Sequence, residues 1–217
     1  MTEILIIRHG ETAWNAVRRL QGHLDIPLSA EGERQAAALA HALRDEPLDA
    51  IYSSDLRRAR QTAEAVARAR GMTIIVEPGL RERSFGGFEG LLYAEIGARY
   101  PAEFAAWKAR EFDAGLPPGE RAGETLREFF ERTVGAVRDI LMRDRHRRVA
   151  MFTHGGVLEC VHRAAQGLRP DRPRDFDILN AGINRLHWDG NRLHLLSWGE
   201  VEHLRAERLA ALDEIDR

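Results

Sequence analysis

Short apolar runs alternate along this chain with longer segments whose apolar residues recur at helical spacing, and this alternation constrains the fold more than any other feature. Short apolar runs indicate buried strands, and a repeat of about 3.6 residues indicates one face of a helix. Such alternation favours a mostly parallel sheet with helices on both faces. The predicted strands span Glu3–Ile7, Ala50–Ser53, Thr73–Val76 and Val149–Phe152. The predicted helices span Ser29–Leu43, Leu56–Arg70, Tyr93–Arg110 with a break at Pro101, Glu124–Arg143 and Val157–Gln166.

The C-terminal part of the chain carries a different pattern. Two apolar stretches, Ile183–Trp188 and Arg192–Trp198, flank Asp189-Gly190, a pair typical of a tight hairpin turn. The hairpin would add an antiparallel edge to the sheet. No repeat or long linker divides the chain, so we expect a single domain over residues 1–200, followed by a charged tail, helical or frayed, over residues 201–217.

Composition excludes several classes of protein. The net charge of −2 gives no electrostatic support for nucleic-acid binding. No stretch approaches the roughly 20 apolar residues of a membrane helix, and Ile4–Ile7 is too short for a signal-peptide core. With Cys160 as the only cysteine, the chain has no internal disulfide, which favours a reducing cytoplasm. Lys108 is the only lysine, so an anion site here must use arginine and backbone N–H groups.

In open α/β sheets, ligands bind beyond the carboxyl ends of the strands. Two such positions carry a histidine followed by glycine, namely His9-Gly10 and His154-Gly155. A single histidine is usually structural, but a pair at equivalent strand ends suggests a shared site. The glycines would let the backbone approach a ligand closely.

Arginines and one carboxylate stand at the same predicted strand ends. Arg8 precedes His9, and Arg57 and Arg58 open the helix after the second strand, where an anionic ligand would offset their unfavourable position on the helix dipole. We interpret Arg57 as part of a solvated helix face. Glu82 lies between two arginines, which is compatible with a surface ion pair or with a proton donor at the mouth of the site.

Four ordered motifs carry a resemblance to a known family. Arg8-His9-Gly10-Glu11-Thr12, with Trp14-Asn15 and Gln21-Gly22, resembles the opening of the histidine phosphatase superfamily, the phosphoglycerate-mutase-like proteins. Residues 53–63, 80–90 and 153–156 are similar to its second motif, its acidic proton-donor stretch and its second-histidine motif. The matches extend from Ile4 to about Trp198. The resemblance implies a three-layer α/β/α fold with a mainly parallel central sheet.

The resemblance also implies a mechanism and a set of site residues. His9 would attack phosphorus, and its other ring nitrogen should donate to a backbone carbonyl that fixes the tautomer. Glu82 would transfer protons, which requires a raised pKa. The implied catalytic residues are His9, Glu82 and His154, and the implied substrate-binding residues are Arg8, Arg58, Asn15, Gln21 and Gly155. No cofactor and no metal are expected, and the partner would be a small phosphorylated metabolite rather than nucleic acid or a membrane.

Alternatives to this reading stay open. His9, Glu11, His23 and Asp25 would form a metal-ligand set on paper, but neither an HExxH motif nor a cysteine pair is present. We interpret the remaining histidines as structural or exposed, namely His162, His187, His194 and His203. Residues 85, 88, 104 and 107, all Phe or Trp, would either line an apolar lid or form helix core.

Departures from the family pattern favour a phosphatase over a mutase. Mutases of this family carry a long insertion where this chain has only the loop Glu111–Gly123, and a family tyrosine is replaced around Phe85-Gly86. Gln21 aligns with a mutase threonine. We therefore predict a metal-independent phosphomonoesterase that forms a phosphohistidine. A bisphosphoglycerate-dependent phosphoglycerate mutase and a non-catalytic phospho-ligand binding module are the alternatives, and the sequence leaves a homodimer open.

Overall fold

The computed structural model describes residues 1–143 and 146–205 of the chain. A six-stranded sheet, in the order β3-β2-β4-β1-β5-β6, forms its centre. The strands are β1 (Thr2–Arg8), β2 (Ala50–Ser53), β3 (Ile74–Val76), β4 (Arg148–Thr153), β5 (Ile183–Trp188) and β6 (Leu193–Glu200). β3, β2, β4 and β1 are parallel, whereas β5 runs antiparallel to β1 and to β6. The predicted parallel sheet with an antiparallel edge is confirmed.

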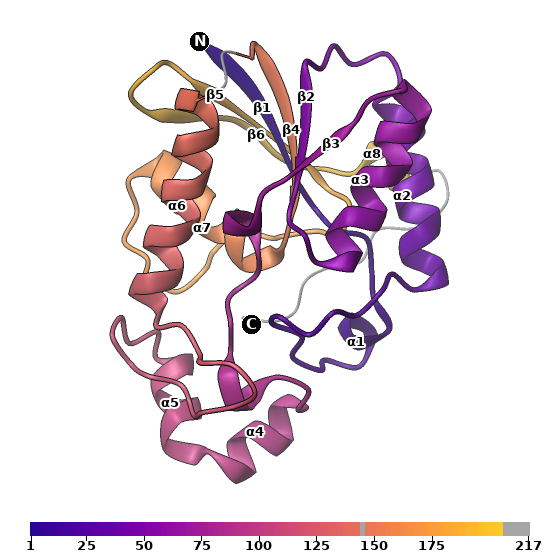
Figure 1. The fold of residues 1–217 in the computed structure, drawn as a ribbon. Coiled ribbons are helices and arrows are strands. Elements are labelled where there is room, and N and C mark those ends of the chain that lie inside the picture. Colours follow the sequence, from indigo (N-terminus) through magenta and orange to yellow (C-terminus); the bar gives the residue numbers. More distant parts are fainter. Residues whose placement is uncertain (144–145, 206–217) are drawn as a thin grey trace.

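Helices cover both faces of the sheet, as Figure 1 shows. Helices α4 and α5 form a small helical part that lies below the sheet in the view of Figure 1. The helices are α1 (Ala13–Ala16), α2 (Ala30–Ala42), α3 (Arg57–Arg70), α4 (Tyr93–Arg99), α5 (Pro101–Lys108), α6 (Leu126–Arg143), α7 (Gly155–Gln166) and α8 (Glu202–Arg205), with short 3₁₀ turns at Pro78–Leu80 and Gly86–Phe88. The implied three-layer α/β/α fold is confirmed.

Strand β1 shows how the sequence builds the two cores. Because successive side chains of a strand point to opposite faces, a strand covered on both sides must be apolar throughout. Ile4 and Ile6 pack into the core under α6 and α7, and Leu5 and Ile7 pack into the core under α2 and α3. All four side chains are at most 2% exposed. The continuous apolar run therefore places β1 in the middle of the sheet.

Two of the predicted helix ends follow the expected capping chemistry. The Ser29 hydroxyl accepts a hydrogen bond from the Gly32 N–H at the start of α2. Gly71 ends α3 in the left-handed conformation, at φ 64°. Helix α7 departs from the prediction, because it begins at Gly155 rather than at Val157. The low helix propensity of a Gly-Gly pair hides this start in the sequence, and the packing of α7 against the sheet overrides it.

The predicted boundary near residue 200 falls where the chain still contacts the core. Val201 is 7% exposed and Leu204 is fully buried, and both pack with the residues under α2. Residues 206–217 of the predicted tail lie outside the described residues, so the division at residue 200 stays a prediction. Within the part of the chain that the structure describes, none of the helices combines the length and the apolar character needed to cross a membrane.

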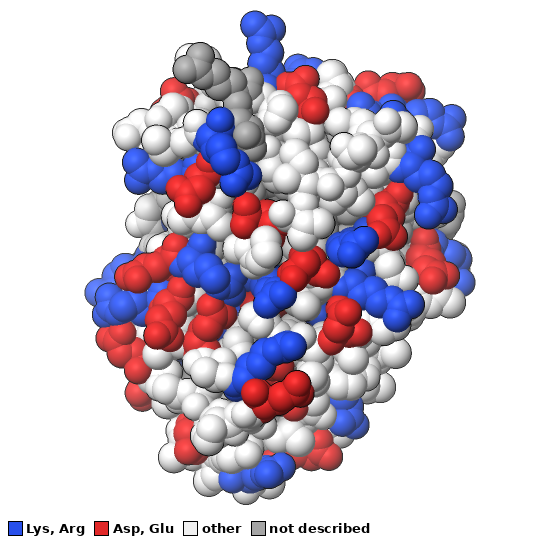
Figure 2. All heavy atoms as spheres, in the orientation of Figure 1, with Lys and Arg blue, Asp and Glu red and all other residues white. Residues whose placement is uncertain are grey.

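Charged side chains of both signs are interspersed on the face of the molecule that Figure 2 shows. Several arginines are instead buried, and these lie around the cavity described below: Arg8, Arg58, Arg83 and Arg163. Burying a cation is costly in a protein interior unless partners offset the cost, and Arg163, for example, pairs with Glu159. The distribution of charge therefore directs attention to the interior of the molecule rather than to its surface.

Candidate active site

The two predicted histidines lie close together, at the carboxyl ends of the neighbouring strands β1 and β4. In the parallel pair β1–β4, Arg8 lies opposite Thr153, so His9 and His154 leave the sheet side by side. Helix α2 packs on one face of the sheet and α7, which follows β4, packs on the other, which opens a crevice between the strand ends. The ring centroids of His9 and His154 are 5.2 Å apart. Sheet register thus brings together residues that are far apart in the sequence.

His9 has a single tautomer in this setting. Its Nδ1 is 2.7 Å from the Gly10 carbonyl oxygen, which only accepts, so Nδ1 donates and Nε2 keeps a lone pair. Burial lowers the pKa of His9 well below its ordinary value, and the positive charges of Arg58 and Arg8 lower it further. The ring is therefore neutral at neutral pH. The predicted hydrogen bond from the second ring nitrogen to a backbone carbonyl is confirmed.

His154 lies beside His9, but it does not itself reach the cavity. Its side chain is fully buried, and the described residues that line the cavity include His9 but not His154. His154 Nε2 forms a hydrogen bond of 2.9 Å with the Ser54 hydroxyl, and its Nδ1 has no hydrogen-bond partner among the described residues. Burial, followed by the charge of Arg58, lowers the pKa of His154 well below its ordinary value.

Two buried guanidinium groups lie in the same crevice. Arg58, in the first turn of α3, donates to the Gly22 and Leu24 carbonyls at 2.8 and 2.9 Å, while Arg8 donates to the Ile178 carbonyl at 3.1 Å. Burial lowers the pKa of Arg58 to about 10, which leaves it charged at neutral pH. Because these hydrogen bonds go to carbonyls, the positive charge of Arg58 is held without being neutralised, an arrangement that favours an anion. Arg57 is exposed, as predicted.

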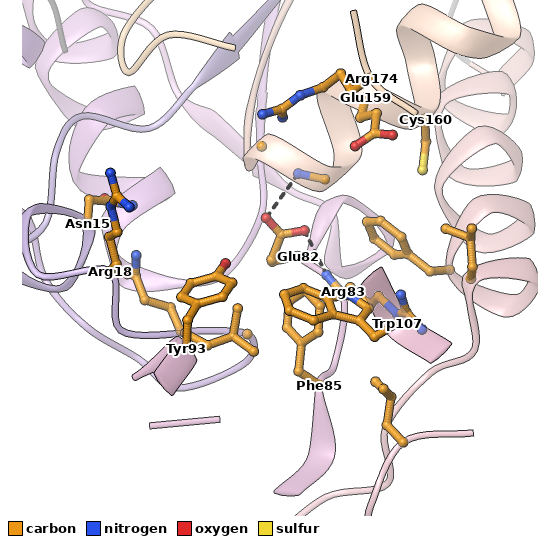
Figure 3. A pocket seen from close by; sticks show the side chains of 18 of the residues that line it. Asn15, Arg18, Glu82, Arg83, Phe85, Tyr93, Trp107, Glu159, Cys160 and Arg174 are labelled. Atoms are coloured by element: carbon orange, nitrogen blue, oxygen red, sulfur yellow. Dashed lines mark hydrogen bonds between the residues drawn. The ribbon is translucent and has the colours of Figure 1, made fainter. Parts of the chain in front are cut away.

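Glu82 points into the cavity from the loop after β3, as Figure 3 shows. Its two carboxylate oxygens accept the Arg83 N–H at 2.9 Å and the Gly156 N–H at 3.1 Å. Burial raises the pKa of Glu82, against the opposing effect of these two hydrogen bonds. The arginine before it pairs with Asp55 instead, so the alternative of a surface ion pair between Glu82 and its neighbours is wrong. A carboxyl group in this setting carries a proton at higher pH than usual.

The remaining predicted residues also line the cavity. Asn15 fixes its amide oxygen by accepting from the Thr12 N–H at 3.0 Å, which leaves its NH₂ group as the donor. Gln21 is 9% exposed, and its amide oxygen has no hydrogen-bond partner among the described residues. Gly155 lies at the N-terminus of α7, where free N–H groups favour an anion.

Sequence reasoning missed Asn180, which also belongs to this site. Asn180 donates to the His9 carbonyl at 2.8 Å and so holds the loop that carries the histidine. No periodic pattern marks Asn180, because it lies in the irregular loop before β5. Gly10 also differs from expectation: a Cβ there would lie 2.6 Å from the Gly32 carbonyl oxygen, so its close approach is to helix α2.

The cavity has a volume of about 510 Å³ and extends well beyond the two histidines. Figure 3 shows Phe85 and Trp107 on one side and Tyr93 on another, with Glu159 and Cys160 above them. Of the four predicted aromatic residues, Phe85, Phe104 and Trp107 line the cavity and also pack together, whereas Phe88 is core only. Three of these residues therefore line the cavity and pack in the core, and Phe88 packs in the core alone.

The metal-ligand set considered above is not assembled. The His23 Nε2 donates to the Glu82 carbonyl at 2.7 Å, and Asp25 accepts the Arg57 N–H at 2.6 Å. Glu11 accepts from the Ser29 hydroxyl at 3.1 Å. Across residues 1–143 and 146–205, His, Cys, Asp and Glu side chains do not gather in groups of three or more that would hold a metal ion.

Comparisons with known proteins agree with the family resemblance of the sequence motifs. The family model of the histidine phosphatase superfamily (branch 1) matches residues 4–201. The chain is 36% identical over 205 residues to phosphoglycerate mutase-like protein 4 of Arabidopsis thaliana, covering 93% of this chain and 86% of that protein. It is 35% identical over 207 residues to a metal-independent phosphoserine phosphatase of the same plant, covering 94% and 84%. Among solved structures, YhfR of Bacillus stearothermophilus superposes with a TM-score of 0.83 at 32% identity, covering 94% of this chain and 100% of that one.

Proposed function

The chain belongs to the histidine phosphatase superfamily, branch 1, as an enzyme of the histidine-phosphatase type, and from this premise we propose that it is a metal-independent phosphomonoesterase acting through phospho-His9. One observation supports the proposal above others. A neutral histidine of fixed tautomer lines a cavity together with two buried guanidinium groups and a carboxyl group of raised pKa. These are a nucleophile, an anion site and a proton donor.

In the first step, the lone pair of His9 Nε2 attacks phosphorus and the P–O ester bond breaks. The electron pair of that bond goes to the leaving oxygen, which takes the proton of Glu82. In the second step, the Glu82 carboxylate takes a proton from water, the water oxygen bonds to phosphorus and the P–N bond breaks. The electron pair of the P–N bond returns to Nε2. One displacement thus becomes two easier ones, and His9 and Glu82 end as they began.

The anion site would stabilise the charge that spreads over the phosphoryl oxygens. We assign this role to Arg8 and Arg58, assisted by the Asn15 amide, the Gln21 amide and the Gly155 N–H. The His154 ring lies 5.2 Å from that of His9, and we assign its Nδ1, which has no partner among the described residues, to phosphoryl binding. Two guanidinium groups supply the positive charge, so no metal enters the proposal.

The test is hydrolysis of benzyl phosphate in excess EDTA, followed by a search for the intermediate. We expect hydrolysis to continue with the chelator present. When the phosphate is radiolabelled, an alkaline quench should yield a phosphoenzyme whose label maps to His9. Absence of turnover on a broad panel of phosphate esters would instead favour a binding module. Isomerisation of phosphoglycerate that depends on bisphosphoglycerate and outpaces hydrolysis would favour a mutase. A cytoplasmic location and a homodimer stay predictions.

Gly156 offers a test of how Glu82 is held. A Cβ on Gly156 would lie 2.3 Å from Glu82 Oε1 and 3.0 Å from the Phe129 ring, so Gly156→Ala must displace the carboxyl group. We expect kcat/KM to fall by roughly 10- to 100-fold, the usual cost of a displacement of about 1 Å in an active site. Steady-state kinetics on benzyl phosphate measures the loss.

The matched control is Gly135→Ala, also within a helix, because a Cβ there meets nothing within 4 Å. This variant should keep the wild-type kcat/KM and gain about 0.5–1 kcal/mol in the free energy of unfolding. Equal kinetics for the two variants would contradict the role of Gly156.

A further inference from the structure

Ser54 and His154 form a buried pair beside the proposed nucleophile. Ser54 follows β2 and His154 follows β4, and both side chains are fully buried. The Ser54 hydroxyl lies 2.9 Å from His154 Nε2. The Ser54 backbone is held at both of its polar groups, because its N–H donates to the Phe152 carbonyl at 3.0 Å and its carbonyl accepts from the Ser53 hydroxyl at 2.8 Å. The sheet therefore sets the place from which the Ser54 hydroxyl reaches His154.

The hydrogen bonds around Ser54 decide where the protons of this pair lie. The Ser54 oxygen accepts from the Leu56 N–H at 3.3 Å and otherwise bonds only to His154 among the described residues. If the hydroxyl donates to His154 Nε2, the neutral ring carries its proton on Nδ1, and that N–H is the one polar group of the pair left unpaired. If Nε2 donates instead, the Ser54 hydroxyl proton and the Nδ1 lone pair both lack a partner. Because each buried unpaired polar group is costly, the first arrangement is the more stable one.

The count of protons assumes a neutral ring, and the surroundings of His154 support this. Burial lowers the pKa of His154 well below its ordinary value, and the positive charge of Arg58 lowers it further. A neutral imidazole carries one proton, on one of its two nitrogens. The partner of Nε2 therefore decides whether Nδ1 offers a proton or a lone pair.

The order of the strands places Nδ1 of His154 on the side of the proposed chemistry. Strand β4 lies between β2 and β1, so His154 lies between Ser54 and His9. The two nitrogens of an imidazole point away from each other, so a ring whose Nε2 faces Ser54 directs Nδ1 away from β2. The ring centroids of His154 and His9 are 5.2 Å apart. The oxygens of a phosphoryl dianion only accept hydrogen bonds, so they need a proton at Nδ1 rather than a lone pair.

The two histidines thus have the same tautomer and use it for opposite purposes. In His9, the Gly10 carbonyl holds the Nδ1 proton, which leaves the Nε2 lone pair for phosphorus. In His154, the Ser54 hydroxyl holds the Nε2 lone pair, which leaves the Nδ1 proton. A carbonyl only accepts a hydrogen bond, whereas a hydroxyl also donates one, so the partner determines which nitrogen of each ring stays available.

We propose that Ser54 is a positioning residue that fixes the tautomer of His154, so that the neutral ring donates its Nδ1 proton in a hydrogen bond to the phosphoryl group. This inference rests on the proposed function, in which His154 Nδ1 binds the phosphoryl group, and adds the residue that gives this atom its proton. The described residues that line the cavity do not include Ser54, so it acts through His154 and has no contact with the reacting atoms.

The tautomer is measured by nuclear magnetic resonance on the wild-type protein labelled with ¹⁵N-histidine, at neutral pH and without substrate. Long-range ¹H–¹⁵N correlations distinguish a ring protonated at Nδ1, at Nε2 or at both, and the His154→Ala variant identifies the signals of His154. We expect His154 to be protonated at Nδ1 alone. In Ser54→Ala, the ring should instead show the Nε2-protonated form or a mixture of the two. Inorganic phosphate should shift the Hδ1 signal of wild-type His154, because Nδ1 then donates to a phosphate oxygen.

A double-mutant cycle measures whether Ser54 acts through the His154 ring. Ser54→Ala should lower kcat/KM for benzyl phosphate by roughly 5- to 15-fold, the value of one hydrogen bond. In the His154→Ala background, the same substitution should cost less than about 2-fold, because the ring that Ser54 orients is gone. The matched control is Ser53→Ala, which removes a neighbouring and equally buried hydroxyl. This control should keep the His154 tautomer and the wild-type kcat/KM.

The outcomes distinguish the role of Ser54 from the proposed function. A wild-type His154 protonated at Nε2 or at both nitrogens would overturn the inference, and this spectrum requires no variant to fold. The inference would also be overturned by an unchanged tautomer in Ser54→Ala, or by an Hδ1 signal that saturating phosphate leaves unmoved. An equal loss from Ser54→Ala with and without the His154 ring would show a structural role instead. Absence of ester hydrolysis by a wild-type enzyme that shows the expected tautomer would overturn the proposed function and leave the tautomer assignment standing.

Discussion

His9→Asn should hydrolyse phosphate monoesters about 10⁴-fold more slowly than the wild-type enzyme, or slower still, and should form no phosphoenzyme. The asparagine amide keeps an N–H near the position of Nδ1, so the hydrogen bond to the Gly10 carbonyl can persist. The substitution removes the Nε2 lone pair of His9, and with it the two-step route. Direct attack by water is the only route left, aided by the anion site alone.

Two measurements check this expectation: single-turnover kinetics on benzyl phosphate, and the yield of base-stable phosphoenzyme. Vanadate should still bind to His9→Asn, because Arg8 and Arg58 are unchanged. His194→Asn serves as the control, since His194 lies on the hairpin and bonds to Asp189 far from the cavity in the fold. A His9→Asn enzyme that kept more than about a tenth of the wild-type rate would rule out phospho-His9 as the intermediate.

Burial leaves histidine neutral but arginine charged in this site, and the proposed chemistry depends on this difference. The pKa of His9 starts near neutrality, so burial and two neighbouring charges suffice to keep it neutral and nucleophilic. The pKa of Arg58 starts far higher, so the same burial lowers it only to about 10 and leaves the charge in place. One environment thus holds a neutral nucleophile beside a charged anion site.

The sequence predicted the site where backbone register alone decides the geometry. His9 and His154 each follow a strand end, and the pairing of β1 with β4 in register brings them together. Local patterns do not carry information on depth, so the sequence did not separate His9, which lines the cavity, from His154, which is fully buried and does not line it.

Glu82→Gln should show a loss that depends on the leaving group. Alkyl phosphates need a proton on the departing oxygen, so kcat/KM for benzyl phosphate should fall by roughly 10²- to 10⁴-fold, the usual contribution of a positioned acid. The 4-nitrophenolate ion leaves without help, so kcat/KM for 4-nitrophenyl phosphate should fall by less than about 10-fold. An equal loss on both substrates would indicate that the amide disturbs the anion site instead.

The pH dependence gives the same assignment a second, independent test. The proton-donor role needs Glu82 protonated in the free enzyme, and burial raises its pKa above that of an ordinary carboxyl group. As pH rises through this raised pKa, the group loses its proton, so kcat/KM for benzyl phosphate must fall on the alkaline side. His9 adds no fall over that range, because its pKa is lowered and the ring is already neutral. Since Gln does not titrate, the ratio of wild-type to Glu82→Gln kcat/KM should decline with rising pH, and a ratio independent of pH would assign the proton transfer to another group.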